Sequence, residues 1–191
     1  QEVTVNNNIT IDIKKVKKAP TLFHTQQNVK VKGDGLEKIM IKSKIKSENK
    51  EDVDVNPLSL LDTVNKVRYQ LVEFVGYKSF SIGVPTYQGK ELLKTKLLNK
   101  RGRPYQSVPD FDPKIKDTFE DYQFEGYKNI TCQINFGTDK NPIVSGIYYA
   151  PITMNSFNAD AFFAIQKFDK EPVFVLYYGN EKVADIDIDL D

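Results

Sequence analysis

The feature that most constrains the fold is a strict alternation of apolar and charged residues at positions 38–46. The odd positions hold apolar or small side chains, namely Ile39, Ile41, Ser43 and Ile45. The even positions hold Lys38, Met40, Lys42, Lys44 and Lys46. A period of two is that of a β-strand with one buried face and one solvent-exposed face. We therefore predict a strand with its isoleucines inside, followed by a polar turn at 47–52 and a second extended run at 53–61.

Several further segments have the composition of strands. They are 3–16, 66–71, 129–136, 143–152, 161–168, 172–178 and 182–191. The first is either one strand or two short ones that meet at the asparagines 6–8. A short alternation at 29–31 suggests an edge strand within a loop. Segment 172–178 is apolar on both faces, as in a buried central strand, and a hairpin signal follows it at 179–181. About eight short strands with polar turns predict an all-β fold, an antiparallel β-sandwich.

Residues 76–126 differ from the rest, because glycine and proline become frequent and the apolar periodicity is lost. Four leucines at 92–98 could form one or two helical turns. So long an irregular stretch in a compact domain is usually an ordered insertion or a functional loop. The aromatic residues at 111–127 indicate that this insertion folds back onto the core.

The size and charge of the chain limit the classes of protein to which it can belong. The 191 residues fit one domain, 1–191, and 40% hydrophobic residues suffice for a core. A net charge of +1 argues against a nucleic-acid partner, since such domains are usually strongly basic. No apolar run reaches the roughly 18 residues of a transmembrane helix. The single cysteine, Cys132, cannot form an internal disulfide, and its apolar neighbours Ile130 and Ile134 predict a buried side chain.

Four stretches carry a resemblance to a known family: ITIDI at 9–13, SENKE at 47–51, VDVNPL at 53–58 and PVFVLYYG at 172–179. Together they resemble the DUF4352-type immunoglobulin-like sandwich domains of bacterial secreted proteins and lipoproteins. The resemblance covers residues 1–70 and, more loosely, 127–190. The insertion at 76–126 has no counterpart in it.

The resemblance implies an immunoglobulin-like sandwich in an extracytoplasmic place: the periplasm, the cell surface or the medium. It carries over no catalytic residue. The chain opens with Gln1 rather than Met, so we expect either a removed leader, which for a lipoprotein would have carried the lipid anchor, or a boundary cut at a chosen point.

The sequence gives little support for catalysis. The one histidine, His24, lies in a loop pattern without an evident partner, so we expect an ordinary surface or turn residue. Two pairs of acids could in principle serve glycoside hydrolysis, Asp110 with Asp112 and Glu120 with Asp121. Catalysis depends on the distance between the two carboxyl groups across a cleft, which the sequence does not give. No phosphate-cradling loop or dinucleotide fingerprint occurs, and no cofactor is predicted.

Metal sites are also weakly supported. Zinc usually needs three or four His or Cys ligands, and the chain has one of each. Acidic residues alternate at the end of the chain, namely Asp185, Asp187, Asp189 and Asp191. Neighbours in that row are almost 7 Å apart along a strand, by about 3.4 Å of rise per residue, which is too far to share one calcium ion. A solvated strand face is the favoured interpretation, as it is for the lysines of 42–46.

The clearest binding candidate is a basic turn inside the insertion. Arg101 and Arg103 flank a glycine, and Tyr105 follows after a proline. Arginine offers a planar donor fork that suits carboxylates and phosphates. We predict that these three residues bind an anionic or sugar ligand, with Tyr148 or Tyr149 as a further exposed aromatic. A charged turn without a ligand is the alternative.

Three function classes follow. The first is a non-catalytic structural or protein-interaction module whose partner is another envelope protein. The second is a carbohydrate-binding or adhesin-like module that binds a surface glycan, and it requires solvent-facing aromatic side chains beside polar ones in a concavity. The third, a hydrolase that uses acids of the insertion, requires two carboxyl groups across a cleft. The first class is our expectation, and the second is its main alternative.

Overall fold

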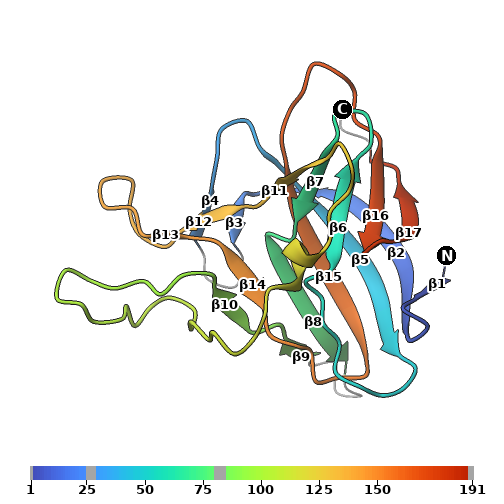
Figure 1. The fold of residues 1–191 in the computed structure, drawn as a ribbon, viewed down its shortest axis with the longest axis horizontal. Coiled ribbons are helices and arrows are strands. Elements are labelled where there is room, and N and C mark those ends of the chain that lie inside the picture. Colours follow the sequence, from blue (N-terminus) through green and yellow to red (C-terminus); the bar gives the residue numbers. More distant parts are fainter. Residues whose placement is uncertain (1, 25–28, 80–84, 189–191) are drawn as a thin grey trace.

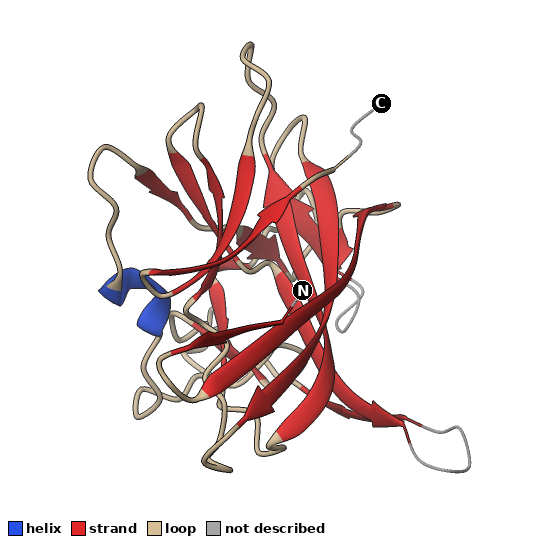
Figure 2. Ribbon diagram, turned by 90° about the vertical axis from the view of Figure 1, so that its right-hand side faces the viewer, coloured by secondary structure: helices blue, strands red, loops and turns tan. Residues whose placement is uncertain are grey.

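The computed structural model describes residues 2–24, 29–79 and 85–188, and their regular structure is almost entirely β (Figure 1). The one helical element in these ranges is a 3-10 turn, η1 (Thr118–Asp121). Figure 2 shows it in blue at one side of the strands. The prediction of an all-β chain is confirmed.

The largest sheet has six antiparallel strands and contains the alternating segment. Its order is β1 (Glu2–Val5), β2 (Ile9–Ala19), β5 (Glu37–Ser47), β15 (Ser156–Ile165), β8 (Glu73–Ser79) and β9 (Pro85–Gln88). The first predicted segment is two strands rather than one. Asn6 and Asn7 take positive φ angles of 51° and 52° in the turn between them, a conformation that asparagine adopts more readily than most residues.

The second large sheet has five strands and includes the predicted central strand. Its order is β11 (Lys128–Ile130), β7 (Val67–Gln70), β6 (Leu58–Asp62), β16 (Phe174–Tyr178) and β17 (Glu181–Ile186). Strand β16 lies inside this sheet, and all its side chains except Tyr177 are buried. The hairpin after β16 is also confirmed: Gly179 has a φ of 60° there, a backbone angle that suits glycine.

Two smaller sheets lie beside these layers (Figure 1). One contains β13 (Val144–Ser145), β12 (Gln133–Asn135), β4 (Val29–Lys32) and β3 (Phe23–His24), and the other pairs β10 (Glu91–Leu93) with β14 (Ile147–Tyr149). The predicted strand 129–136 is therefore divided between two sheets, because β11 pairs with β7 while β12 pairs with β4. Strand β4 lies inside its sheet rather than at an edge.

The buried side chains of both large sheets form one continuous core. Ile39, Ile41 and Ile45 of β5 are each at most 1% exposed, which confirms the predicted inward face. They belong to the same apolar cluster as Leu60 of β6 and Leu176 of β16. Since apolar burial is the main favourable term in folding, this shared cluster holds the two sheets together as a β-sandwich.

The opposite face of β5 departs from prediction at one end. Lys44 and Lys46 are exposed as expected, but Lys38 and Met40 are buried. Register explains the difference, because the neighbouring strands place Phe162 and Glu73 beside this end of β5. The Lys38 ammonium lies 2.6 Å from a Glu73 carboxylate oxygen and 4.6 Å from the Phe162 ring centroid.

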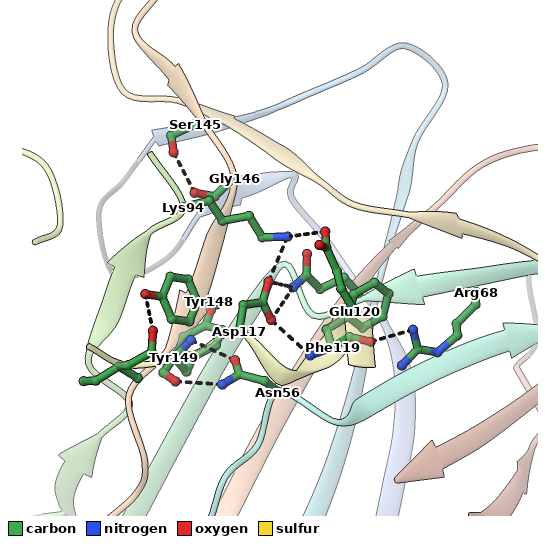
Figure 3. Close-up of polar contacts among 12 residues, drawn as sticks. Asn56, Arg68, Lys94, Asp117, Phe119, Glu120, Ser145, Gly146, Tyr148 and Tyr149 are labelled. Atoms are coloured by element: carbon green, nitrogen blue, oxygen red, sulfur yellow. Dashed lines mark hydrogen bonds and ion pairs between the residues drawn. The ribbon is translucent and has the colours of Figure 1, made fainter. Parts of the chain in front are cut away.

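The irregular segment begins later than predicted, because residues up to Leu93 belong largely to β8, β9 and β10. Of the remaining part, 94–127, the segment around η1 folds back onto the sandwich, as Figure 3 shows for Asp117 and Phe119. Phe119 is fully buried, and the Arg68 guanidinium stacks 3.9 Å from its ring centroid while donating a 2.9 Å hydrogen bond to its carbonyl oxygen. Lys94 forms a 2.9 Å ion pair with Asp117. These contacts fix the base of the long loop that carries the predicted binding residues.

Candidate functional site

Two loops project from the same side of the molecule, at the left of Figure 1. The first, residues 94–112, follows β10, and the second, residues 136–143, joins β12 to β13. Their tips are about 40 positions apart in the sequence. The pairing of β10 with β14 holds the bases of the two loops close together, because β13 leads directly into β14.

The tip of the first loop is a tight turn built around Asn99. Its side-chain oxygen accepts hydrogen bonds from the backbone N–H groups of Arg101 and Arg103, at 2.9 and 3.0 Å. The Asn99 backbone N–H donates to the Arg103 carbonyl oxygen at 2.8 Å. Gly102 has a φ of 72° at the turn. Such an Asx turn fixes the backbone, so both arginines emerge from a defined tip with exposed side chains.

The second loop has a similar internal support. The Asn135 side-chain oxygen accepts from the backbone N–H groups of Gly137 and Ile143, at 2.9 and 3.1 Å. The Asn141 N–H donates to the Thr138 hydroxyl oxygen at 3.0 Å. Both loops thus hold their shape through side-chain bonds to their own backbone.

A hollow of about 690 Å³ lies between the two tips. Its lining comprises Asn99, Lys100, Arg101 and Tyr105 from the first loop and residues 140–143 from the second. We call it the basic hollow, because its charged lining residues are Lys100, Arg101 and Lys140, with no carboxylate among the described residues that line it. Two of the three predicted binding residues therefore line one concave site. Arg103 belongs to the same turn but not to that lining.

Electrostatics favour an anion in the basic hollow. Lys100, Arg101 and Lys140 are all exposed, and like charges held close together repel one another. A concave surface of one sign concentrates ions of the opposite sign. The Arg101 guanidinium can donate two parallel hydrogen bonds to a carboxylate or phosphate, and the half-buried Tyr105 ring offers an adjacent apolar face.

The further aromatics predicted for this site are not there. Tyr148 is 5% exposed and Tyr149 is 0% exposed, so the prediction that one of them is exposed is wrong. The Tyr148 hydroxyl donates to the carbonyl oxygens of Ile115 and Asp112, at 2.8 and 3.0 Å. The Tyr149 ring packs edge-on against Phe74, and its burial raises the pKa of its hydroxyl well above the usual value. Both tyrosines are structural anchors of β14.

His24 is likewise buried rather than on the surface, which corrects the prediction for it. Its Nε2 lies 2.9 Å from a Glu91 carboxylate oxygen, at ion-pair distance although its N–H direction is not aligned for a hydrogen bond. The pair connects β3 to β10, which belong to different small sheets. Sequence reasoning missed it because the two residues are far apart along the chain.

Three of the four acids proposed for hydrolysis are in ion pairs with lysines. Asp110 lies 3.1 Å from the Lys90 ammonium, and Asp121 lies 2.8 Å from that of Lys116. Glu120 lies 3.5 Å from Lys94. Asp112 has a different role, since its carboxylate accepts a 3.0 Å hydrogen bond from the backbone N–H of Lys114.

The remaining titratable candidates are accounted for as follows. Cys132 is buried as predicted, and burial raises the pKa of its thiol to about 11. Asp185 and Asp187 are exposed, as expected for a solvated face, whereas Asp189 and Asp191 lie outside the described residues. Among the residues that the structure describes, no group of three or more His, Cys, Asp or Glu side chains could hold a metal ion.

Sequence analysis did not identify the half of the basic hollow that residues 140–143 form. Residues 140–143 carry a recognisable turn signal, Lys-Asn-Pro, but nothing local relates it to the arginines of the other loop. Only the pairing of β10 with β14 brings the two turns together.

Comparisons with known proteins do not assign this chain to a family. A scan of protein-family models and searches of curated proteins and of solved structures found no match to this chain. The resemblance to DUF4352-type domains stays a prediction. No helix in the described part of the chain is long and apolar enough to span a membrane.

Proposed function

We propose that this protein is a non-catalytic binding module and that its basic hollow holds the acidic part of a carbohydrate ligand. The observation that carries the proposal is the lining of the hollow. Three cations and a tyrosine ring from two separate loops converge on one concavity without a carboxylate among the described lining residues.

The size and chemistry of the hollow suit a saccharide. Small-molecule sites are concave and commonly measure about 300–1,000 Å³, and this hollow falls in that range at about 690 Å³. An acidic sugar presents a carboxylate to Arg101 and C–H bonds to the Tyr105 ring. A protein interface would instead need a larger and flatter area, of about 800 Å² on each partner.

The lining also supports binding without catalysis. Glycoside hydrolysis requires two carboxyl groups on opposite sides of the scissile bond. No carboxyl group is found among the described lining residues of the basic hollow. An extracytoplasmic place, in the periplasm, at the cell surface or in the medium, is part of the proposal and rests on the family resemblance alone.

The test is a binding titration with polygalacturonate, an acidic polysaccharide, and with its carboxyl-reduced form, which is neutral. We expect the acidic polymer alone to bind, and its affinity to fall with added salt, because salt screens exposed charges. Arg101→Ala and Lys140→Ala should each weaken binding roughly tenfold, since a hydrogen bond to a charged group contributes about 1.5 kcal/mol.

Lys44→Ala is the matched control, because it removes one exposed positive charge from the outer face of β5, on an element that does not line the hollow. It should leave the affinity unchanged. Equal binding of the neutral polymer, or an equal loss in the control, would rule out recognition at the basic hollow. Single-stranded DNA serves as a further probe, and binding as tight as that of the polysaccharide would count against a sugar ligand.

A further inference from the structure

A second hollow, of about 930 Å³, lies beside the edge strand β9. Its lining is mainly apolar and includes Val75, Pro151 and the Tyr87 side chain, which is 65% exposed. The Tyr87 ring is held from one side by Tyr77, whose ring centroid is 5.9 Å away. We call this site the tyrosine hollow. A large exposed ring is a surface on which a flat apolar group can stack.

Two polar residues in the lining of the same hollow, Gln88 and Thr153, are hydrogen-bonded to each other. The Gln88 side-chain oxygen accepts hydrogen bonds from the Thr153 backbone N–H and hydroxyl, at 3.1 and 2.9 Å. This arrangement leaves the Gln88 amide nitrogen pointing away from that bond as a donor. An exposed aromatic face beside polar side chains in a concavity suits a sugar ring, which has both C–H faces and hydroxyl groups.

A third hollow, of about 670 Å³, has one lining residue in common with each of the first two. It shares Lys90 with the tyrosine hollow and Tyr105 with the basic hollow. Its charged lining residues are two lysines and two aspartates, so its net charge is zero. Lys90 and Asp110 pair with each other at 3.1 Å across it, and both side chains are exposed. A middle section with no net charge neither attracts nor repels a charged ligand by its overall charge.

One continuous stretch of chain lines all three hollows. Residues 87–90 contribute to the tyrosine hollow, residues 90–113 to the middle hollow, and residues 99–105 to the basic hollow. The surface therefore follows the chain from the sheet edge to the tip of the first loop, which projects at the left of Figure 1. A linear ligand could touch every part of it.

We infer that the three hollows form one extended binding surface for a linear acidic polysaccharide. The chain stacks a sugar on Tyr87, crosses the middle hollow and places an acidic group in the basic hollow. This inference rests on the proposed function and adds the class of ligand, a polymer rather than a single acidic sugar. Linked subsites act at high effective concentration, so affinity should rise steeply with chain length until the ligand spans the surface.

The experiment is a titration of oligogalacturonates from the single sugar to chains of about a dozen units. Over this range, the dependence of affinity on chain length distinguishes linked subsites from isolated ones. We expect the long chains to bind at least about a hundredfold more tightly than the single sugar, well above the roughly twelvefold statistical gain of a dozen equivalent units on one site. Tyr87→Ala should reduce the affinity of long chains to that of short ones and leave the short ones unchanged. Arg101→Ala should weaken both.

Phe168→Ala is the matched control, because Phe168 is an exposed aromatic outside all three hollows. It should change neither series. Polyaspartate, a polyanion without sugar rings, should bind without sensitivity to Tyr87→Ala. A circular dichroism spectrum confirms that the edge-strand variant is folded.

Each contrary result has a distinct meaning. If the long chains gain no more than the statistical factor over the single sugar, with Arg101 required for both, the extended surface is wrong and the basic hollow stands. The same holds if Tyr87→Ala weakens short and long chains alike. If no acidic saccharide binds at all, the proposed function and this inference both fail.

Discussion

At the scale of single residues, this protein buries several charged groups and gives each a specific environment. Lys38 and Glu73 form a 2.6 Å ion pair in which both side chains are almost fully buried. Arg68 is fully buried, donates to Ser59 and to the carbonyl oxygens of Phe119 and Tyr122, and stacks on an aromatic ring. Buried charges are costly unless they are paired, so these residues are sensitive points of the fold.

Lys38→Met should destabilise the protein by roughly 3–5 kcal/mol, because it leaves the Glu73 carboxylate buried without its cation. The double variant Lys38→Met with Glu73→Leu should recover most of that loss, since apolar residues of similar volume often replace a buried pair at little cost. Urea unfolding of the three proteins measures both effects.

The exposed pair of Lys46 and Glu48, 3.1 Å apart, provides the comparison. Lys46→Met should change stability by less than about 1 kcal/mol, because solvent screens exposed pairs. If the Lys46 and Lys38 variants were equally destabilised, burial would not be what makes the Lys38 pair important.

At the scale of elements, the loop bases are tied to the sandwich by a few polar side chains. The main one is Asn56, which lies just before β6 and bonds to the backbone of β14 in both directions (Figure 3). Its side-chain nitrogen donates to the Tyr149 carbonyl oxygen at 2.8 Å, and its side-chain oxygen accepts from the Tyr149 N–H at 2.8 Å. Asn56 thus makes the two hydrogen bonds to the Tyr149 backbone that a neighbouring strand would otherwise make.

Asn56→Ala should therefore cost roughly 2–6 kcal/mol, because it leaves a buried N–H and a buried C=O without their partners at about 1–3 kcal/mol each. Hydrogen exchange should quicken most at the Tyr149 amide and along the β10–β14 pair. Exposed Asn180 supplies the control, and Asn180→Ala should leave both stability and exchange near the wild-type values. A uniform rise in exchange over all sheets would show that Asn56 supports the whole fold rather than β14.

At the scale of the whole molecule, the core buries a thiol and several phenols that all resist ionisation. Burial raises the pKa of Cys132 from 9.0 to about 11 and that of Tyr69 from 10.0 to about 12. Burial likewise raises the pKa of Tyr149 and Tyr178. These groups keep their protons in the folded state at pH values where the unfolded chain releases them.

Stability should accordingly fall as the pH rises above about 9. Below the unfolded pKa of each group both states are protonated and the full stability is present; above it, ionisation favours the unfolded chain until the folded pKa is reached. Cys132 alone should account for a loss of stability on the order of 3 kcal/mol between pH 9 and pH 11, since each pKa unit corresponds to about 1.4 kcal/mol.

Urea unfolding from neutral to alkaline pH measures this decline, and Cys132→Ala should flatten its first part, between the two thiol pKa values. If stability fell with pH as steeply in Cys132→Ala as in the wild type, the thiol would not contribute to the pH dependence. The native thiol should also react slowly with a disulfide reagent near neutral pH and quickly once the protein is unfolded, because the thiolate is the reactive form.

The sequence alone determined the fold class and most of the strands. The alternation at 38–46, the apolar run at 172–178 and the turn at Gly179 each encode a local period or backbone angle, and all three appear in the structure. It also drew attention to Arg101 and Tyr105, because a basic aromatic turn is a local pattern. Local patterns can be read from a chain because they depend on neighbours in sequence.

The tertiary structure alone decided which of these residues meet. The burial of Lys38, His24 and Tyr148 depends on partners from distant strands and loops, so the sequence led to the wrong exposure for each. The pairing of β10 with β14 places Lys140 opposite Arg101. The physical reason is that burial and charge convergence are set by sheet order and register, which arise from contacts between segments far apart in the chain.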